Sequence, residues 1–397
     1  MKKWVFLSCV LAAALLAAGF LPLFSPALPE NEAVLPAAVD RAGVYYKEGA
    51  VATAAAADIV MEQSGYVLSA GNAHTRMGMA STTKIMTALL AIERLDPETV
   101  VTVPKEAVGI EGSSIYLTEG EQITVSDLLY GLMLESGNDA ATALAIAAGG
   151  TVEDFVRLMN ERAAELGLED THFSNPHGLS ADDHYTTAYD LARLTCAALE
   201  NETFAAIVSC KTKTISDGRR YLSNHNRLLR SYEGCIGVKT GYTKAAGRIL
   251  VSSATRDGLT LIAVVLGSPS SADRFHSATT LLDYGFANYA AAPLPTLPER
   301  PLALAVKGSA EDSVPLDYAA LPETILIEKG TASALRAELT LSEALEAPVE
   351  KGQTVGKVSI FQDDTLLNEY EVKAAADAPL LTFGGALELL WQCLLGA

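Results

Sequence analysis

The pattern of hydrophobic and polar positions divides most of the chain into strand-like and helix-like segments. Residues 57–68 carry two β-rich runs around Ser64-Gly65, which predicts a hairpin. A second hairpin is predicted at 248–266, where two apolar runs flank Asp257-Gly258. Between and after the hairpins, apolar residues recur at helical spacing in 81–94, 125–148, 151–166, 187–200 and 272–286. This order predicts one α+β domain over 57–290 whose terminal segments share an antiparallel sheet.

The C-terminal third has a different pattern. Four prolines between Pro293 and Pro301 predict a linker over 291–301. Residues 302–375 lack a helical period and contain short β-rich runs, so we expect a small all-β, sandwich-like domain there. The tail at 376–397 is mostly apolar, with a narrow polar stripe, which predicts an amphipathic anchor on the outer face of the cytoplasmic membrane. Docking of the tail on the protein's own surface is the alternative.

The N-terminus indicates export. Lys2 and Lys3 precede an apolar run, and small residues follow at Ser25-Pro26-Ala27, so residues 1–27 are predicted to be a signal peptide. An uncleaved N-terminal anchor is the alternative, and both place the rest of the chain outside the cytoplasm. Residues 28–56 are rich in Ala and Pro and are interpreted as a tether.

Charge and cysteine content exclude some functions. The formal net charge of −19 argues against nucleic-acid binding, which requires clustered Lys and Arg. Three cysteines lie between the two apolar ends, at Cys196, Cys210 and Cys235. They leave either one disulfide or free thiols, and their spacing is not that of a metal site. We expect neither a metal nor a cofactor.

Three short motifs suggest chemistry, and each occurs once. They are Ser81-Thr82-Thr83-Lys84, Ser136-Gly137-Asn138 and Lys239-Thr240-Gly241. Singly, they could be a helix cap, a turn and the end of a strand. Together they follow the order used by penicillin-recognising serine enzymes.

The first motif pairs a nucleophile with a base. Positions i and i+3 of a helix share a face, so the Lys84 amine can reach the Ser81 hydroxyl. The helix is apolar on most of its circumference, which predicts that Lys84 is buried. Lysine can take a serine proton only if its pKa falls, through desolvation or a nearby like charge such as Lys239.

The other two motifs then have definable roles. Ser136 could relay the proton to the leaving amine, and Asn138 could hold both Lys84 and a substrate amide. Lys239 and Thr240 could bind a substrate carboxylate. The missing side chain of Gly241 would let a substrate backbone approach the strand edge.

The chain strongly resembles the low-molecular-weight penicillin-binding proteins, specifically the serine D-alanyl-D-alanine carboxypeptidases of the peptidase S11 type. The resemblance extends from about Ala57 to Phe286 and rests on the three motifs and their surroundings, with further similar blocks at 173–179, 185–192 and 237–243. It implies a penicillin-binding/β-lactamase-like transpeptidase domain, an antiparallel sheet with a helical subdomain.

The resemblance also implies a reaction and a substrate. Ser81 would attack the bond between two terminal D-alanines of a peptidoglycan stem peptide, and β-lactam antibiotics would acylate the same serine. The backbone N–H groups of Ser81 and Tyr242 would form the oxyanion hole. The family's carboxylate-binding arginine corresponds to Arg274, with Arg248 as the alternative.

Three other functions share parts of this pattern. A β-lactamase would share the chemistry, but no Glu-x-x-Leu-Asn segment for deacylation occurs. A DD-endopeptidase of the same superfamily differs only in the bond that is cut. A catalytically idle cell-wall scaffold would have no use for the complete set of motif residues.

Overall fold

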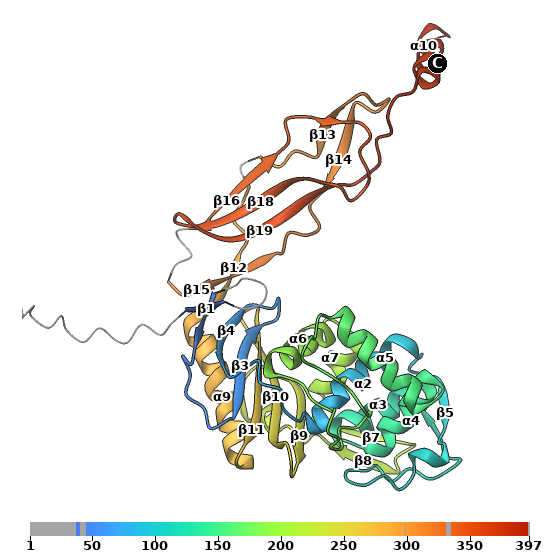
Figure 1. Ribbon diagram of the computed structural model, residues 1–397, viewed down its shortest axis with the longest axis vertical. Helices are drawn as coiled ribbons and strands as arrows, with labels where there is room; N and C mark the ends of the chain where they lie inside the picture. The colour runs from blue at the N-terminus through green and yellow to red at the C-terminus, as the bar shows by residue number, and fades with distance from the viewer. Residues whose placement is uncertain (1–36, 40–44, 298, 331–334, 396–397) are drawn as a thin grey trace, which may run out of the picture.

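The computed structural model describes residues 37–39, 45–297, 299–330 and 335–395 (Figure 1). A seven-stranded sheet forms the centre of the first domain, in the order β1-β2-β4-β3-β11-β10-β9. Neighbouring strands are antiparallel except β2 and β4. The strands are β1 (Ala37–Val39), β2 (Tyr45–Glu48), β3 (Ala57–Glu62), β4 (Val67–Gly71), β9 (Cys235–Thr243), β10 (Gly247–Arg256) and β11 (Leu259–Ser268).

Both predicted hairpins are confirmed, as β3–β4 and β10–β11. Strand β3 pairs with β11 about 200 residues later, for example Ile59 with Val264. The terminal segments of the domain therefore share one antiparallel sheet, as the α+β prediction requires.

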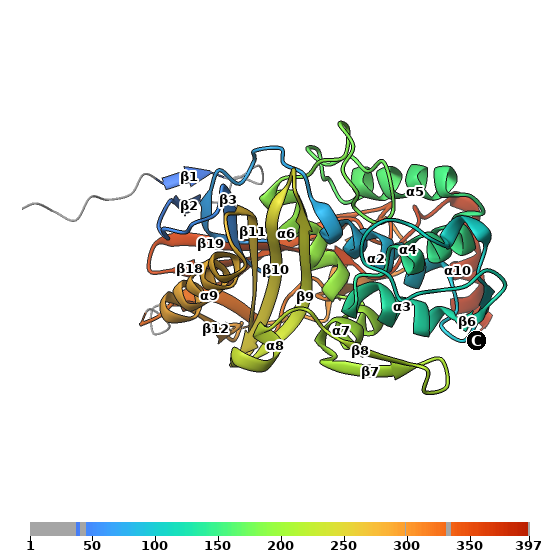
Figure 2. The same ribbon diagram turned by 90° about the horizontal axis from the view of Figure 1, so that it is seen from below.

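The sheet is covered on both faces. Side chains alternate along a strand, so Ile59 and Met61 pack with the helical region while Val60 packs toward α9 (Ser271–Asn288). Figure 1 shows α9 on one side of the sheet and helices α2 to α7 on the other, and Figure 2 shows the same layers from below.

The helical region contains most of the predicted helices. Helix α5 (Val152–Glu165) and α6 (Ala188–Leu199) confirm the predictions at 151–166 and 187–200. The remaining elements are η1 (Ala80–Thr83), α2 (Lys84–Arg94), β5 (Val100–Thr102), η2 (Lys105–Ala107), β6 (Gln122–Thr124), α3 (Val125–Leu134), α4 (Asn138–Gly149), α7 (Glu202–Ser209), β7 (Thr212–Ile215), β8 (Arg220–Ser223) and α8 (Leu228–Ser231).

Two predicted helix boundaries were wrong. The single helix expected at 125–148 is two helices, α3 and α4, because Ser136 has a φ of 63°, which a right-handed helix does not allow. The helix expected to start at Ser81 starts at Lys84, and Ser81 lies in the preceding 3₁₀ turn η1. Both departures lie at motif residues.

The C-terminal domain is all-β. Strand β12 (Tyr289–Pro293) pairs with β15 (Thr324–Glu328), so residues 291–293 of the expected linker belong to a strand. A second sheet has the order β16-β18-β19-β14-β13-β17. Its strands are β13 (Ala303–Lys307), β14 (Ser313–Asp317), β16 (Leu335–Leu341), β17 (Leu345–Glu346), β18 (Thr354–Gln362) and β19 (Thr365–Ala374). Residues of both sheets, such as Ile325 and Val358, share one core.

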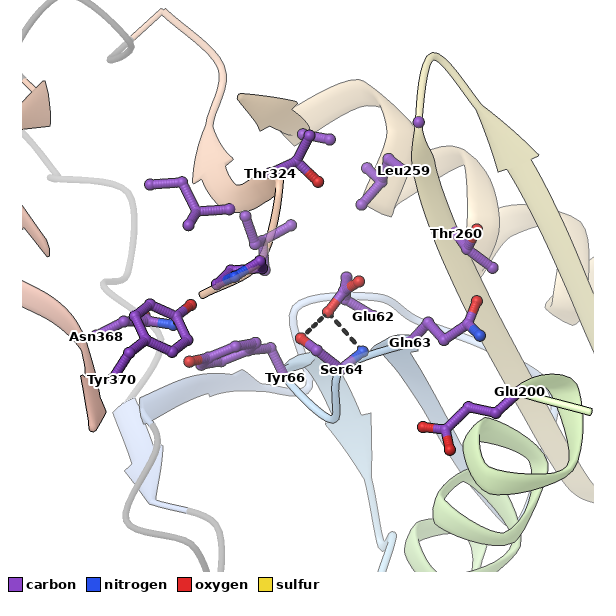
Figure 3. Close-up of a pocket in the computed structure, with 15 residues that line it drawn as sticks. Glu62, Gln63, Ser64, Tyr66, Glu200, Leu259, Thr260, Thr324, Asn368 and Tyr370 are labelled. Carbon is purple, nitrogen blue, oxygen red and sulfur yellow. Dashed lines mark hydrogen bonds between the residues drawn. The ribbon is translucent and has the colours of Figure 1, made fainter. Parts of the chain in front are cut away.

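The two domains meet at a cavity of about 480 Å³. Figure 3 shows Glu62, Ser64 and Tyr66 of the first domain facing Thr324 and Tyr370 of the second. None of the residues of the three motifs lines this cavity. Beyond the second domain, helix α10 (Phe383–Leu395) lies at the far end of the molecule (Figure 1).

The three cysteines between the apolar ends form no disulfide. Cys196, Cys210 and Cys235 are free thiols. Burial raises the pKa of Cys196 to about 12, so this thiol is unreactive at neutral pH. Of the two alternatives, free thiols are the one observed.

Candidate active site

The turn that carries Ser81 has an unusual backbone. Ala80 has a φ of 45°, a left-handed conformation that strains a non-glycine residue by roughly 1–3 kcal/mol. Two side-chain hydrogen bonds hold the turn: Thr82 Oγ1 donates to Met79 O at 2.5 Å, and Thr83 Oγ1 donates to Ala80 O at 2.8 Å. In a 3₁₀ turn, residues i and i+3 eclipse, which places Lys84 directly above Ser81.

Lys84 is fully buried and has three polar neighbours. Its Nζ lies 3.3 Å from Ser81 Oγ, 2.7 Å from Asn138 Oδ1 and 2.6 Å from the carbonyl oxygen of His177. Desolvation, followed by the positive charge of Lys239, holds the pKa of Lys84 well below its ordinary value. The sequence therefore correctly predicted burial, contact with Ser81 and the effect of Lys239.

Ser136 and Asn138 lie at the break between α3 and α4. Ser136 has a positive φ, and both residues are buried. Asn138 Oδ1 accepts a hydrogen bond from Lys84 Nζ. Asn138 Nδ2 donates to Glu111 O at 2.6 Å, which orients the amide oxygen toward Lys84. The buried Ser136 Oγ has no hydrogen-bond partner among the described residues, so its hydroxyl can bond a ligand.

Strand β9 brings the third motif to the nucleophile turn. A side chain on Gly241 would lie 3.3 Å from Ser81 N and 3.3 Å from Met79 O, so glycine allows this close approach without displacing the turn. Lys239 is buried, and its Nζ donates to Thr240 O at 3.1 Å. Burial and the charge of Arg274 lower the pKa of Lys239 to about 7. Tyr242, the next residue, is half exposed.

The structure distinguishes the two candidate arginines. Arg274 is buried, reaches β9 from α9 and donates to Gly241 O at 3.2 Å. Its Nε has no hydrogen-bond partner in the described part of the chain. The Arg248 guanidinium instead lies over the Tyr242 ring, 4.5 Å from its centroid. Arg274 therefore has an unpaired donor among the described residues, and its charge acts on Lys239.

Sequence reasoning missed several supporting groups. The carbonyl of His177 accepts from Lys84, while burial lowers the pKa of the His177 imidazole to about 4. Asp139 accepts from the backbone N–H groups of Ile115 and Leu117 and so fixes the loop beside Asn138. Because a backbone carbonyl is common to all residues, it leaves no signal in the sequence. Asp139 could have been found by its position next to the second motif.

This fold and site define a serine hydrolase of the penicillin-recognising class. Residues 45–270 match the family profile described as D-alanyl-D-alanine carboxypeptidase, and residues 302–379 match the C-terminal domain of penicillin-binding protein 5. The D-alanyl-D-alanine carboxypeptidase DacF of Bacillus subtilis is 35% identical over 342 residues, which cover 83% of this chain and 88% of the relative.

Solved structures agree with the sequence matches. Penicillin-binding protein 5 of Haemophilus influenzae is 31% identical, with a TM-score of 0.72 over 83% of this chain and 98% of the other. The carboxypeptidase DacD of Francisella tularensis is 28% identical, with a TM-score of 0.64 over 91% and 100%. The chain belongs to the D-alanyl-D-alanine carboxypeptidase family, and it is a serine-type hydrolase of the D-Ala-D-Ala bond.

Proposed function

We propose that this enzyme removes the terminal D-alanine from peptidoglycan stem pentapeptides through an acyl-enzyme on Ser81. The single observation that carries the proposal is the buried Lys84 amine, 3.3 Å from Ser81 Oγ and next to Asn138. Lys84 forms no ion pair within the described part of the chain, and a buried lysine without one is unfavourable for stability, so its presence here supports a catalytic use.

The neighbours of Lys84 leave its lone pair available to Ser81. A neutral amine has two hydrogens, and they match the two close acceptors, Asn138 Oδ1 and His177 O. The third direction faces Ser81 Oγ. Lys84 can therefore take the hydroxyl proton as Ser81 Oγ attacks the carbonyl carbon of the penultimate D-alanine.

The tetrahedral intermediate then collapses to products. Its oxyanion is stabilised by the N–H groups of Ser81 and Tyr242, where loss of one donor typically costs about 3 kcal/mol of barrier. The carbon–nitrogen bond breaks, and the leaving amine receives its proton through Ser136. Water attacks the acyl-enzyme, gives its proton to Lys84, and restores Ser81 with release of the shortened peptide.

The cations on β9 and α9 select a substrate with a free carboxylate. Lys239 and Arg274 lie together, so an anion between them would be bound by two positive charges. Asn138 holds the substrate amide, Thr240 adds a hydroxyl donor, and Gly241 leaves the edge of β9 open to the peptide backbone. This arrangement favours a carboxypeptidase over an endopeptidase, since the leaving group is then a free amino acid. β-Lactam antibiotics place a carboxylate and a reactive carbonyl in the same positions.

The test uses a synthetic pentapeptide ending in D-Ala-D-Ala and a labelled penicillin. Ser81→Ala should release no D-alanine and take no label, whereas Ser64→Ala, a serine outside the motifs, should behave as the wild type. Cleavage or labelling by Ser81→Ala would contradict the mechanism. Faster cleavage of a cross-linked dimer than of the pentapeptide would favour the endopeptidase.

The enzyme works outside the cytoplasm, and α10 anchors it at the membrane surface. Five of its apolar side chains are exposed: Phe383, Leu387, Leu390, Trp391 and Leu394. No helix in the described part of the chain is long and apolar enough to cross a bilayer. An apolar helix of 13 residues would lie in the plane of the interface.

Truncation tests this placement. Protein lacking 377–397 should stay in the supernatant with anionic phospholipid vesicles, while the signal-cleaved full chain should sediment with them. Equal sedimentation of the two would contradict the anchor. Equal activity on the soluble pentapeptide serves as the folding control.

A further inference from the structure

His184 lies behind the nucleophile turn and joins it to a separate loop. The residue is almost completely buried, and its Nε2 lies 2.7 Å from Thr83 Oγ1. Its Nδ1 accepts a hydrogen bond of 3.0 Å from the backbone N–H of Ser174. His184 belongs to none of the three motifs, and it contacts neither Ser81 nor Lys84 through a hydrogen bond described here.

The donor and the acceptor of each of these hydrogen bonds follow from the partner groups. A nitrogen that accepts from a backbone N–H carries no proton, so the neutral imidazole carries its proton on Nε2. Nε2 must then donate to Thr83 Oγ1. Because Thr83 Oγ1 receives this bond, its own hydrogen is free to donate to Ala80 O, at 2.8 Å. These hydrogen bonds form a relay that runs from Ser174 N–H through His184 and Thr83 to Ala80 O.

This hydrogen-bond relay ends at the Ala80–Ser81 peptide group, which faces the substrate in the proposed mechanism. Ala80 O and Ser81 N–H belong to one planar unit, so fixing the carbonyl also fixes the direction of the N–H. The positive φ of Ala80 is uncommon for alanine and needs such external support. Gly178 packs on the same carbonyl, where an added side chain would lie 1.9 Å from Ala80 O.

We propose that His184 and Thr83 are positioning residues, which orient the Ala80–Ser81 peptide so that the Ser81 N–H points at the developing oxyanion. The inference rests on the proposed function of Ser81. Preorganised donors stabilise a transition state only when their direction is already fixed, so a rotating peptide would lose rate without losing the serine or its base.

The imidazole also supports the base from the other side. Ser174 starts the loop in which Pro176 O accepts from Thr87 Oγ1 at 2.6 Å and His177 O accepts from Lys84 Nζ. Burial is the main cause that lowers the pKa of His184 to about 4, with Asp183 opposing it and His172 and Lys84 acting in the same direction as burial. The imidazole is therefore neutral near neutral pH, and each hydrogen bond of the relay keeps the same donor and acceptor.

Thr83→Val tests the hydrogen bond from Thr83 Oγ1 to Ala80 O. Valine keeps the shape of threonine but has no hydroxyl. Removal of a whole oxyanion donor lowers rates by about 10²–10³, so misdirecting one should slow acylation by labelled penicillin roughly 10-fold or more. Thr83→Ser should acylate within about 3-fold of the wild type, because the hydroxyl is kept. Thr195→Val is the matched control, since Thr195 Oγ1 makes a similar buried bond to Leu191 O on α6.

Two further measurements separate positioning from folding. A boronic acid analogue of the acyl-D-alanine unit forms a tetrahedral adduct on serine, and its affinity should fall in Thr83→Val as much as the acylation rate does. The acid limb of the pH–rate profile, which reports Lys84, should not move in this variant. His184→Gln, which keeps a donor at the Nε2 position, should retain more activity than His184→Leu.

The proposal is overturned if Thr83→Val acylates at the wild-type rate, or if Thr83→Ser is as slow as Thr83→Val. It is also overturned if Thr195→Val loses as much rate at the same melting temperature. An active Ser81→Ala would instead defeat the proposed function, so the two failures can be told apart.

Discussion

Burial of a charged lysine for catalysis should destabilise the fold, and Lys239 allows the size of this effect to be worked out. Its pKa is about 7 in the folded protein and 10.5 in the unfolded chain. This gap corresponds to about 5 kcal/mol, at about 1.4 kcal/mol per pH unit. Below pH 7 both states are protonated, so the fold bears the whole cost of burying the charge.

The sign of the pH dependence follows. Between pH 7 and 10.5 the unfolded chain binds more protons than the folded one, so wild-type stability rises with pH in this window. Lys239→Met removes the titrating amine and, with it, this contribution to the pH dependence of stability. The variant should therefore gain most at pH 6, by up to about 5 kcal/mol less the packing changes, and only about 2 kcal/mol by pH 9. Relief of the neighbouring Lys84 acts in the same direction.

The measurement is urea unfolding at pH 6 and pH 9. Helical circular dichroism is the suitable signal, because the helices belong mainly to the first domain, whereas the only two tryptophans, Trp4 and Trp391, lie outside it. The packing change contributes equally at the two pH values. The difference in unfolding free energy between Lys239→Met and the wild type should therefore be about 3 kcal/mol smaller at pH 9 than at pH 6. Lys244→Met, at an exposed position after the same strand, is the control and should show a constant difference. If the difference in unfolding free energy between Lys239→Met and the wild type were the same at both pH values, burial of Lys239 would not lower its pKa as described.

Three other outcomes are expected. Because Lys239 loses its charge above pH 7, kcat/KM for peptides with a free carboxylate should fall there, and Lys239→Arg should move the fall to higher pH in a pH–rate profile. Gly178→Ala should abolish penicillin labelling and lower the melting temperature because of the contact with Ala80 O, whereas Gly218→Ala, with a similar φ and open space around it, should keep its labelling. Arg274→Gln should raise KM roughly 10- to 100-fold for the carboxylate peptide. An equal rise for its C-terminal amide would contradict a carboxylate role.

The sequence predicted elements where the local pattern agreed with the final packing. The two hairpins and helices α5 and α6 have strong turn or periodic signals, and they formed within a few residues of the expected bounds. The prediction failed at 125–148, where an apolar pattern continues across the motif while Ser136 breaks the helix. Hydrophobic periodicity reports burial, and residues on both sides of this break are buried.

By itself, the sequence determined the chemical groups of this protein and their order. Ser81, Lys84, Ser136, Asn138 and Lys239 could be named, and the apolar helix around Lys84 already implied a buried amine. The tertiary structure alone decided how these groups are oriented. The supports of the site are backbone atoms of distant segments, such as His177 O on Lys84, and the strained peptide of Ala80. Every residue has the same backbone atoms, so their placement depends on long-range packing that no local pattern specifies.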